Sequence, residues 1–114
     1  MIKRKTTDED LAIAVDARIR DLKDRLDLKG NEYVRDADRL HNFRSVAAFN
    51  DTTMETALWG MLSKHLCSIK DMIKDAERGT AWDQHIWNEK IGDAMAYLAL
   101  LDVIRQEARK HHEA

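Results

Sequence analysis

The sequence has no proline, only four glycines and a single cysteine in 114 residues. Proline and glycine are unfavourable inside helices, so their scarcity favours long uninterrupted helices over sandwiches or barrels. The lone cysteine, Cys67, cannot form an internal disulfide, and we expect it to be a buried structural thiol. With 44% apolar and 35% charged residues, the composition predicts one all-α domain over residues 1–114, with residues 1–6 as a flexible basic tail.

The sequence lacks the features that are typical of several classes of protein. The formal net charge is −2 and basic residues alternate with acidic ones, so we expect no surface for duplex nucleic acid or an anionic membrane. No signal peptide is visible, and no apolar run approaches the roughly 20 residues of a transmembrane helix. A glycine-rich phosphate loop is also missing. These observations predict a cytoplasmic protein.

Four segments have apolar residues at the three- and four-residue steps of an amphipathic helix. Capping boxes at residues 6–9 and 52–55 start the first and third segments, which end at Gly30 and Gly79. The second, less regular segment covers about residues 31–49, and the fourth extends from Thr80 to about Lys110. They predict a four-helix bundle-like fold centred on the third and fourth helices. The apolar stripe of the first helix is Leu11, Val15, Ile19, Leu22 and Leu26.

The fourth segment has two apolar stripes about a quarter turn apart. One comprises Trp87, Ile91, Ala94, Leu98 and Leu101, and the other comprises Trp82, Ile86, Leu100 and Ile104. A helix that is apolar on two sides is either central or packs against a second subunit. We therefore expect self-association into a homodimer or higher oligomer, with Trp82, Ile86 and Ile104 at the interface.

Two carboxylates, Glu89 and Asp93, fall within the second stripe, with Tyr97 at its margin. Buried carboxylates are costly unless they are paired or bind a cation, and a spacing of four residues places both near enough to share one metal ion. An equally weighted alternative makes them ion-pair partners of Arg39, Lys64 or Lys90.

A histidine, His65, occupies the centre of the third helix's apolar stripe, where a leucine would be expected. A hydrogen-bonded core histidine is one interpretation. The functional alternative is a catalytic proton carrier, or a metal ligand, that faces Glu89 and Asp93.

The stretch from Lys29 to Phe43 is rich in charged side chains and also contains aromatic anchors. Glu32 and Asp36 lie about one helical turn apart, and Arg39 and Asn42 supply planar donors suited to phosphate or carboxamide groups. This stretch predicts one wall of a polar cleft, and a charged linker with internal salt bridges is the alternative. The candidate substrate-binding residues are Lys29, Arg39, Asn42, Lys64 and Tyr97.

Three blocks, KGNEY…DRLHNF, KHLCSIKDM and NEKIGDAMAYLALL, occur in this order between Lys29 and Leu101. They resemble a group of small phage and prophage proteins, which implies a host-cytoplasmic location. More distantly, the chain resembles the all-α nucleoside triphosphate pyrophosphatases, the MazG and dimeric dUTPase relatives. That resemblance implies that acidic side chains on adjacent helices hold magnesium, while water attacks between the α and β phosphates.

The acidic motifs depart from the pattern of that superfamily. Arg35 stands three residues after Glu32, where the superfamily has a second glutamate, and Lys90 stands where an acid precedes Asp93. Two hypotheses therefore stay open. One is a magnesium-dependent nucleotide pyrophosphohydrolase or nucleotide-binding relative, with Glu32, Glu89 and Asp93 as metal ligands. The other is a non-catalytic phage accessory protein that binds a host or phage protein.

Overall fold

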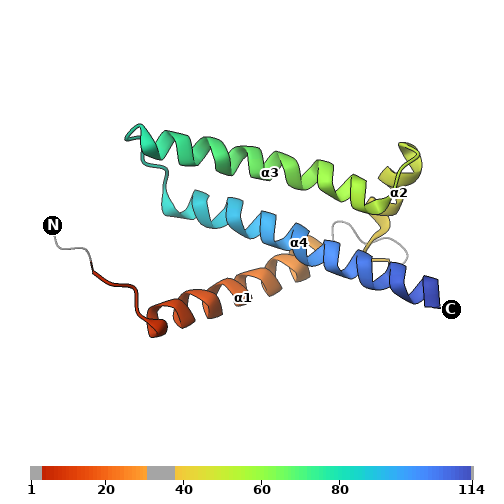
Figure 1. The fold of residues 1–114 in the computed structure, drawn as a ribbon, viewed down its shortest axis with the longest axis horizontal. Coiled ribbons are helices and arrows are strands. Elements are labelled where there is room, and N and C mark those ends of the chain that lie inside the picture. Colours follow the sequence, from red (N-terminus) through yellow and green to blue (C-terminus); the bar gives the residue numbers. More distant parts are fainter. Residues whose placement is uncertain (1–3, 31–37, 114) are drawn as a thin grey trace.

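The computed structural model describes residues 4–30 and 38–113, and Figure 1 shows their arrangement. They form four helices, namely α1 (Asp8–Gly30), α2 (His41–Phe49), α3 (Met54–Glu77) and α4 (Gln84–Glu113). No strand occurs among these residues, so the predicted all-α class is confirmed. In the same part of the chain, no helix is long and apolar enough to cross a membrane.

Side chains near the predicted capping boxes start the first and third helices. Thr7 Oγ1 accepts a hydrogen bond from the backbone N–H of Asp10, and Asp10 Oδ2 accepts one from the N–H of Thr7. The reciprocal partner is therefore Asp10 and not Glu9, and these hydrogen bonds lower the pKa of Asp10. Thr53 caps α3 by accepting from the N–H of Thr56.

The core lies between α2, α3 and α4, whereas the sequence predicted a centre formed by the third and fourth helices. Its buried side chains are Leu40, Phe43, Leu58, Leu62, Ala94 and Ile104. Ile104 has no exposed surface, because it packs inside its own chain. This corrects the expectation that Ile104 lies at a subunit interface. Cys67 is exposed, so the predicted buried thiol is also wrong.

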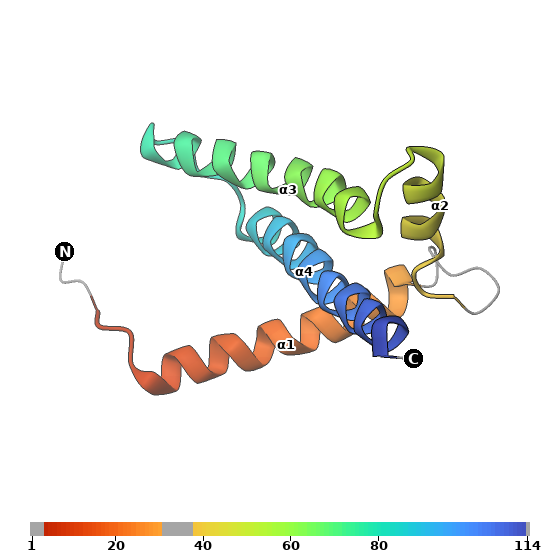
Figure 2. The same cartoon turned by 45° about the vertical axis from the view of Figure 1, so that its right-hand side comes forward.

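The first helix packs on α4 only along its C-terminal part, and its N-terminal half extends away from the other helices (Figures 1 and 2). Three residues of its apolar stripe, Leu11, Val15 and Ile19, are therefore 45–59% exposed. The radius of gyration is 17.3 Å, whereas a compact domain of this length has a value of about 13 Å. A single copy of the chain is thus elongated, with much of α1 uncovered.

Candidate functional site

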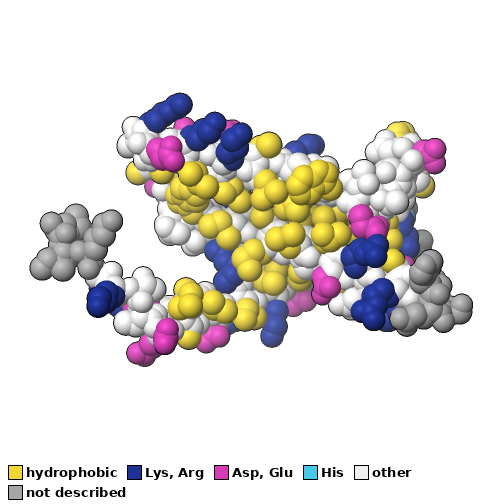
Figure 3. Space-filling model, viewed as in Figure 1, with side chains coloured by type: hydrophobic (Ala, Val, Ile, Leu, Met, Phe, Trp, Pro, Cys, Tyr) yellow, Lys and Arg dark blue, Asp and Glu magenta, His cyan; other side chains and the backbone are white. Residues whose placement is uncertain are grey.

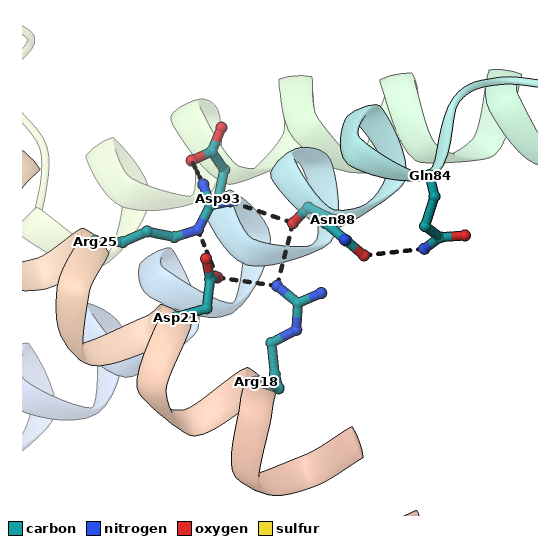
Figure 4. Close-up of polar contacts among 6 residues, drawn as sticks. All are labelled: Arg18, Asp21, Arg25, Gln84, Asn88 and Asp93. Atoms are coloured by element: carbon teal, nitrogen blue, oxygen red, sulfur yellow. Dashed lines mark hydrogen bonds and ion pairs between the residues drawn. The ribbon is translucent and has the colours of Figure 1, made fainter. Parts of the chain in front are cut away.

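The junction between α1 and α4 is made by two arginines (Figure 4). Arg25 donates from Nε to Asp21 Oδ2 at 2.6 Å and from Nη1 to Asp93 Oδ1 at 2.8 Å. Its Nη2 donates to the backbone carbonyl of Asn88 at 3.3 Å, and Arg18 donates to the same oxygen at 3.1 Å. A carbonyl oxygen has two lone pairs, so it can accept from both arginines. Arg25 therefore links α1 to α4 and fixes the position of the Asp93 carboxylate.

Close approach of Arg25 to α4 depends on a residue without a side chain. A Cβ atom added at Gly92 would lie 2.8 Å from Arg25 Nη2 and nearer still to Nε and Cζ. Any other residue here would displace the guanidinium or the helix. The glycine of the EKIGD segment thus makes room for the arginine that pairs with the next residue, Asp93.

Charge around Arg25 is balanced by two acids. Partial burial by itself lowers the pKa of Arg25, but hydrogen bonds and charge interactions with Asp21 and Asp93 outweigh it, so the net shift is upward. The side chains of Arg25 and Asp93 are 15% and 14% exposed. The Arg25–Asp93 pair is therefore largely shielded from water.

A pocket of about 120 Å³ lies beside this ion pair, where the C-terminal part of α1, the start of α2 and the middle of α3 and α4 meet. Its apolar wall is formed by Leu26, Phe43, Met61, Ala96 and Leu100. Its polar wall is formed by Arg25, Arg39, Asn42, His65, Asp93 and Tyr97. The combination of one apolar wall and a few convergent polar groups is typical of small-molecule sites.

The rings of His65 and Tyr97 are neighbours in the polar wall of the pocket. The ring centroids of His65 and Tyr97 are 5.2 Å apart with an interplanar angle of 35°, and Phe43 contacts Tyr97 edge-on at 6.5 Å. His65 Nδ1 is also 3.9 Å from Asp93 Oδ2. Protonation of the histidine would thus place a second cation beside this carboxylate.

The turn before α2 brings Arg39 to the same pocket. Asp38 accepts hydrogen bonds from the N–H of Leu40 at 3.0 Å and from Arg44 Nε at 2.7 Å, and the first of these lowers the pKa of Asp38 most. Arg39 itself is exposed and donates from Nη2 to the backbone carbonyl of Leu26. Within residues 4–30 and 38–113 no carboxylate pairs with Arg39.

The structure brings five of the residues proposed from the sequence to this pocket, and they are Arg39, Asn42, His65, Asp93 and Tyr97. Lys64 is exposed and lines a separate crevice between α2 and α3. Lys29 belongs to α1, but its side chain, like the whole of Glu32, lies outside the described residues.

The acidic pair expected within an apolar stripe is not assembled. Glu89 is exposed and does not line the pocket, although Asp93 does. Asp93 forms an ion pair with Arg25, a partner that the sequence did not suggest, and among the described residues no ion pair joins it to Arg39, Lys64 or Lys90.

These acids do not fit a magnesium ion that would bind both of them. Magnesium needs several oxygen ligands in octahedral geometry, whereas Asp93 Oδ1 already accepts from Arg25 and Glu89 faces solvent. Over the described part of the chain, no group of three or more His, Cys, Asp or Glu side chains could hold a metal ion.

Sequence reasoning missed Arg25, although a signal for it exists. Arg18 and Arg25 are seven residues apart, and they lie directly before Ile19 and Leu26 of the apolar stripe of α1. Cations at these positions require anionic or carbonyl partners from another element. Gly92 is the second signal. Glycine is unfavourable within a helix, and here it leaves space for the side chain of Arg25 to pass close to α4.

Comparisons with known proteins leave the site to be interpreted from its own geometry. No protein-family model, no curated protein and no solved structure matches the chain.

Proposed function

We propose that the protein binds a nucleotide in the pocket between α1, α2, α3 and α4. The observation that carries the proposal is the convergence on one pocket of Arg39, which has no carboxylate partner in the described part of the chain, of Asn42, and of the neighbouring, tilted rings of His65 and Tyr97. A guanidinium and a carboxamide are suited to phosphate oxygens, and aromatic rings are suited to a base.

The dimensions of the pocket favour a particular orientation. Its volume of about 120 Å³ is well below the roughly 300–1,000 Å³ of a typical ligand pocket, so only part of a nucleotide would be enclosed. The base would lie against Tyr97 and His65 inside the pocket. The phosphates would extend to the mouth, where the exposed Arg39 is placed.

The proposal concerns nucleotide binding, and hydrolysis of the bound nucleotide would require further groups. The resemblance to all-α nucleoside triphosphate pyrophosphatases supports a nucleotide ligand and also implies magnesium. Because Glu89 and Asp93 do not fit a shared ion, a metal-dependent reaction would require further acids such as Glu32, which lies outside the described residues. In such a reaction His65, 3.9 Å from Asp93, would be the candidate proton carrier.

A panel of nucleoside triphosphates, with and without magnesium, tests this proposal by thermal shift and by phosphate or pyrophosphate release. A nucleotide present at 100 times its Kd stabilises the fold by about 2.7 kcal/mol. Arg39→Ala should lose most of the shift, whereas Arg20→Ala, which removes an exposed arginine on α1, should retain it. Stabilisation without release identifies a binding module, and no shift with any nucleotide at millimolar concentration would contradict the proposal.

A non-catalytic accessory protein that binds another protein is the second candidate. Large apolar side chains at the surface favour it, among them Phe49, which is 92% exposed.

We further propose that the chain self-associates, because one copy exposes more surface than a compact monomer of its mass. A protein that oligomerises but ignores every nucleotide would favour the accessory function.

A further inference from the structure

Two helices carry apolar stripes that no part of the described chain covers. On α1 the stripe is formed by Leu11, Val15 and Ile19. On α3 the stripe is formed by Trp59, Leu66 and Ile73, which are 41–59% exposed and lie seven residues apart. A seven-residue spacing places side chains along one line of a helix, which is the geometry of a helix–helix seam. Figure 3 shows apolar side chains gathered over α3, α4 and the N-terminal half of α1 on one face.

The exposed surface of one copy is larger than that of a compact monomer of the same mass. The chain exposes 8972 Å², whereas a compact monomer of 13.2 kDa exposes about 6,400 Å². The difference of about 2,500 Å² per copy exceeds the roughly 800 Å² that each partner buries in a standard interface. One copy therefore has enough additional surface for a stable interface.

The chain cannot cover these stripes by folding α1 back on itself. α1 is one unbroken helix of 23 residues, about 35 Å long, with no glycine or proline before Gly30. Its C-terminal part is fixed to α4 by Arg18 and Arg25, so the direction of residues 8–17 is fixed as well. Closure would require breaking either the helix or this junction.

We propose that a second copy of the chain covers this face, with the α1 stripe of each copy packed on the α3 stripe of the other. This arrangement rests on the self-association proposed above and names its surface. A two-fold axis makes such a contact reciprocal, so both stripes of both copies are buried at once.

Charges beside the stripes support this pairing. The first turn of α1 is acidic, with Asp8, Glu9 and Asp10, and exposed Lys70 and Lys74 lie beside the α3 stripe. Opposite charges at the rim of an interface favour the correct register. The stripe of α1 is about 12 Å long and that of α3 about 21 Å, at 1.5 Å per residue, so α3 can receive the whole stripe of its partner.

Light scattering of the full chain at tens of micromolar tests the arrangement. We expect twice 13.2 kDa for the parent and 13.2 kDa for Val15→Glu and for Leu66→Glu, because each buries a charge in the proposed contact. Phe49→Glu is the matched control, since it makes the same kind of change at an exposed residue outside both stripes and should stay dimeric. Val15 and Leu66 are 46% and 41% exposed, so unchanged helical circular dichroism should accompany dissociation.

Mixing two charge variants tests which stripe meets which. Val15→Glu mixed with Leu66→Lys should recover the dimer, because opposite charges then meet at one contact and the other contact is unaltered. No recovery would overturn the pairing of α1 with α3. A parent of 13.2 kDa would overturn self-association itself, and a compact monomer in X-ray scattering would show that the chain covers its own stripes. An oligomer that survives Val15→Glu and Leu66→Glu would overturn only the surface named here.

Discussion

Replacing Asp93 by asparagine tests the interpretation of this residue as the structural partner of Arg25. The change preserves the shape of the side chain but removes its charge, which lies 2.8 Å from Arg25 Nη1. Arg25 is then left with Asp21 as its acidic partner. If Asp93 were instead held beside other carboxylates to bind a metal, removal of its charge would relieve repulsion and would be neutral or stabilising. The two interpretations therefore predict changes of opposite sign.

The size of the effect follows from burial. Breaking a fully buried ion pair costs about 3–5 kcal/mol, and an exposed pair contributes about 0–1 kcal/mol. Arg25 and Asp93 are 15% and 14% exposed, but the asparagine oxygen can still accept from Arg25. We expect a loss of about 2 kcal/mol, which for a domain of this size lowers Tm by roughly 8 °C.

Thermal melts followed by circular dichroism, without added metal, measure this loss. Asp102→Asn is the matched control, because Asp102 is an exposed aspartate on the same helix whose bond from Gln106 an asparagine oxygen can also accept. The control should melt close to the parent. Asp93→Asn that melts with the control, or above it, would refute the structural role of the ion pair.

Two further predictions concern other positions. Gly60→Ala, where a Cβ meets no atom within 4 Å, should stabilise the protein by up to about 1 kcal/mol, whereas Gly92→Ala should destabilise it because the new Cβ displaces Arg25. Denaturant melts measure both, and equal effects would contradict the close packing at Gly92. The hydrogen bond from Arg105 lowers the pKa of Glu55, so the ionised carboxylate stabilises the fold above its unfolded pKa and this contribution disappears as pH falls through the folded pKa. Glu55→Gln should therefore lower Tm near neutral pH and converge with the parent at about pH 2, and a Tm difference independent of pH would contradict this linkage.

The helices could be predicted from the sequence because their signals are local. Thr53 caps the start of α3 with its own side chain. Gly79 follows the end of that helix with a φ of 87°, a conformation that glycine adopts without strain. The first capping box was placed one residue too early, at Glu9 instead of Asp10. Such an error moves a hydrogen bond, but it does not change where the helix begins.

The tertiary contacts were harder to predict, because an apolar stripe does not specify what covers it. The stripe of α1 was expected to be buried, yet Leu11, Val15 and Ile19 are exposed in one copy of the chain. Arg25, which forms an ion pair with Asp93, lies 68 residues from it in the sequence, and no local pattern encodes that pairing. Glu89 and Asp93 differ by about 40° around the helix at 3.6 residues per turn, which is enough to separate an exposed carboxylate from a shielded one.

The pocket beside the Arg25–Asp93 pair is the proposed binding site for a nucleotide. Nuclear magnetic resonance of the side-chain rings, during titration with a nucleotide that raises Tm, tests this most directly. The ring signals of His65 and Tyr97 should shift with saturation, because a base stacked in the pocket changes their magnetic environment. The signals of His85, which is exposed near the start of α4 and does not line the pocket, should stay unchanged. A nucleotide that binds while the signals of His65 and Tyr97 remain in place would contradict the assignment of this pocket.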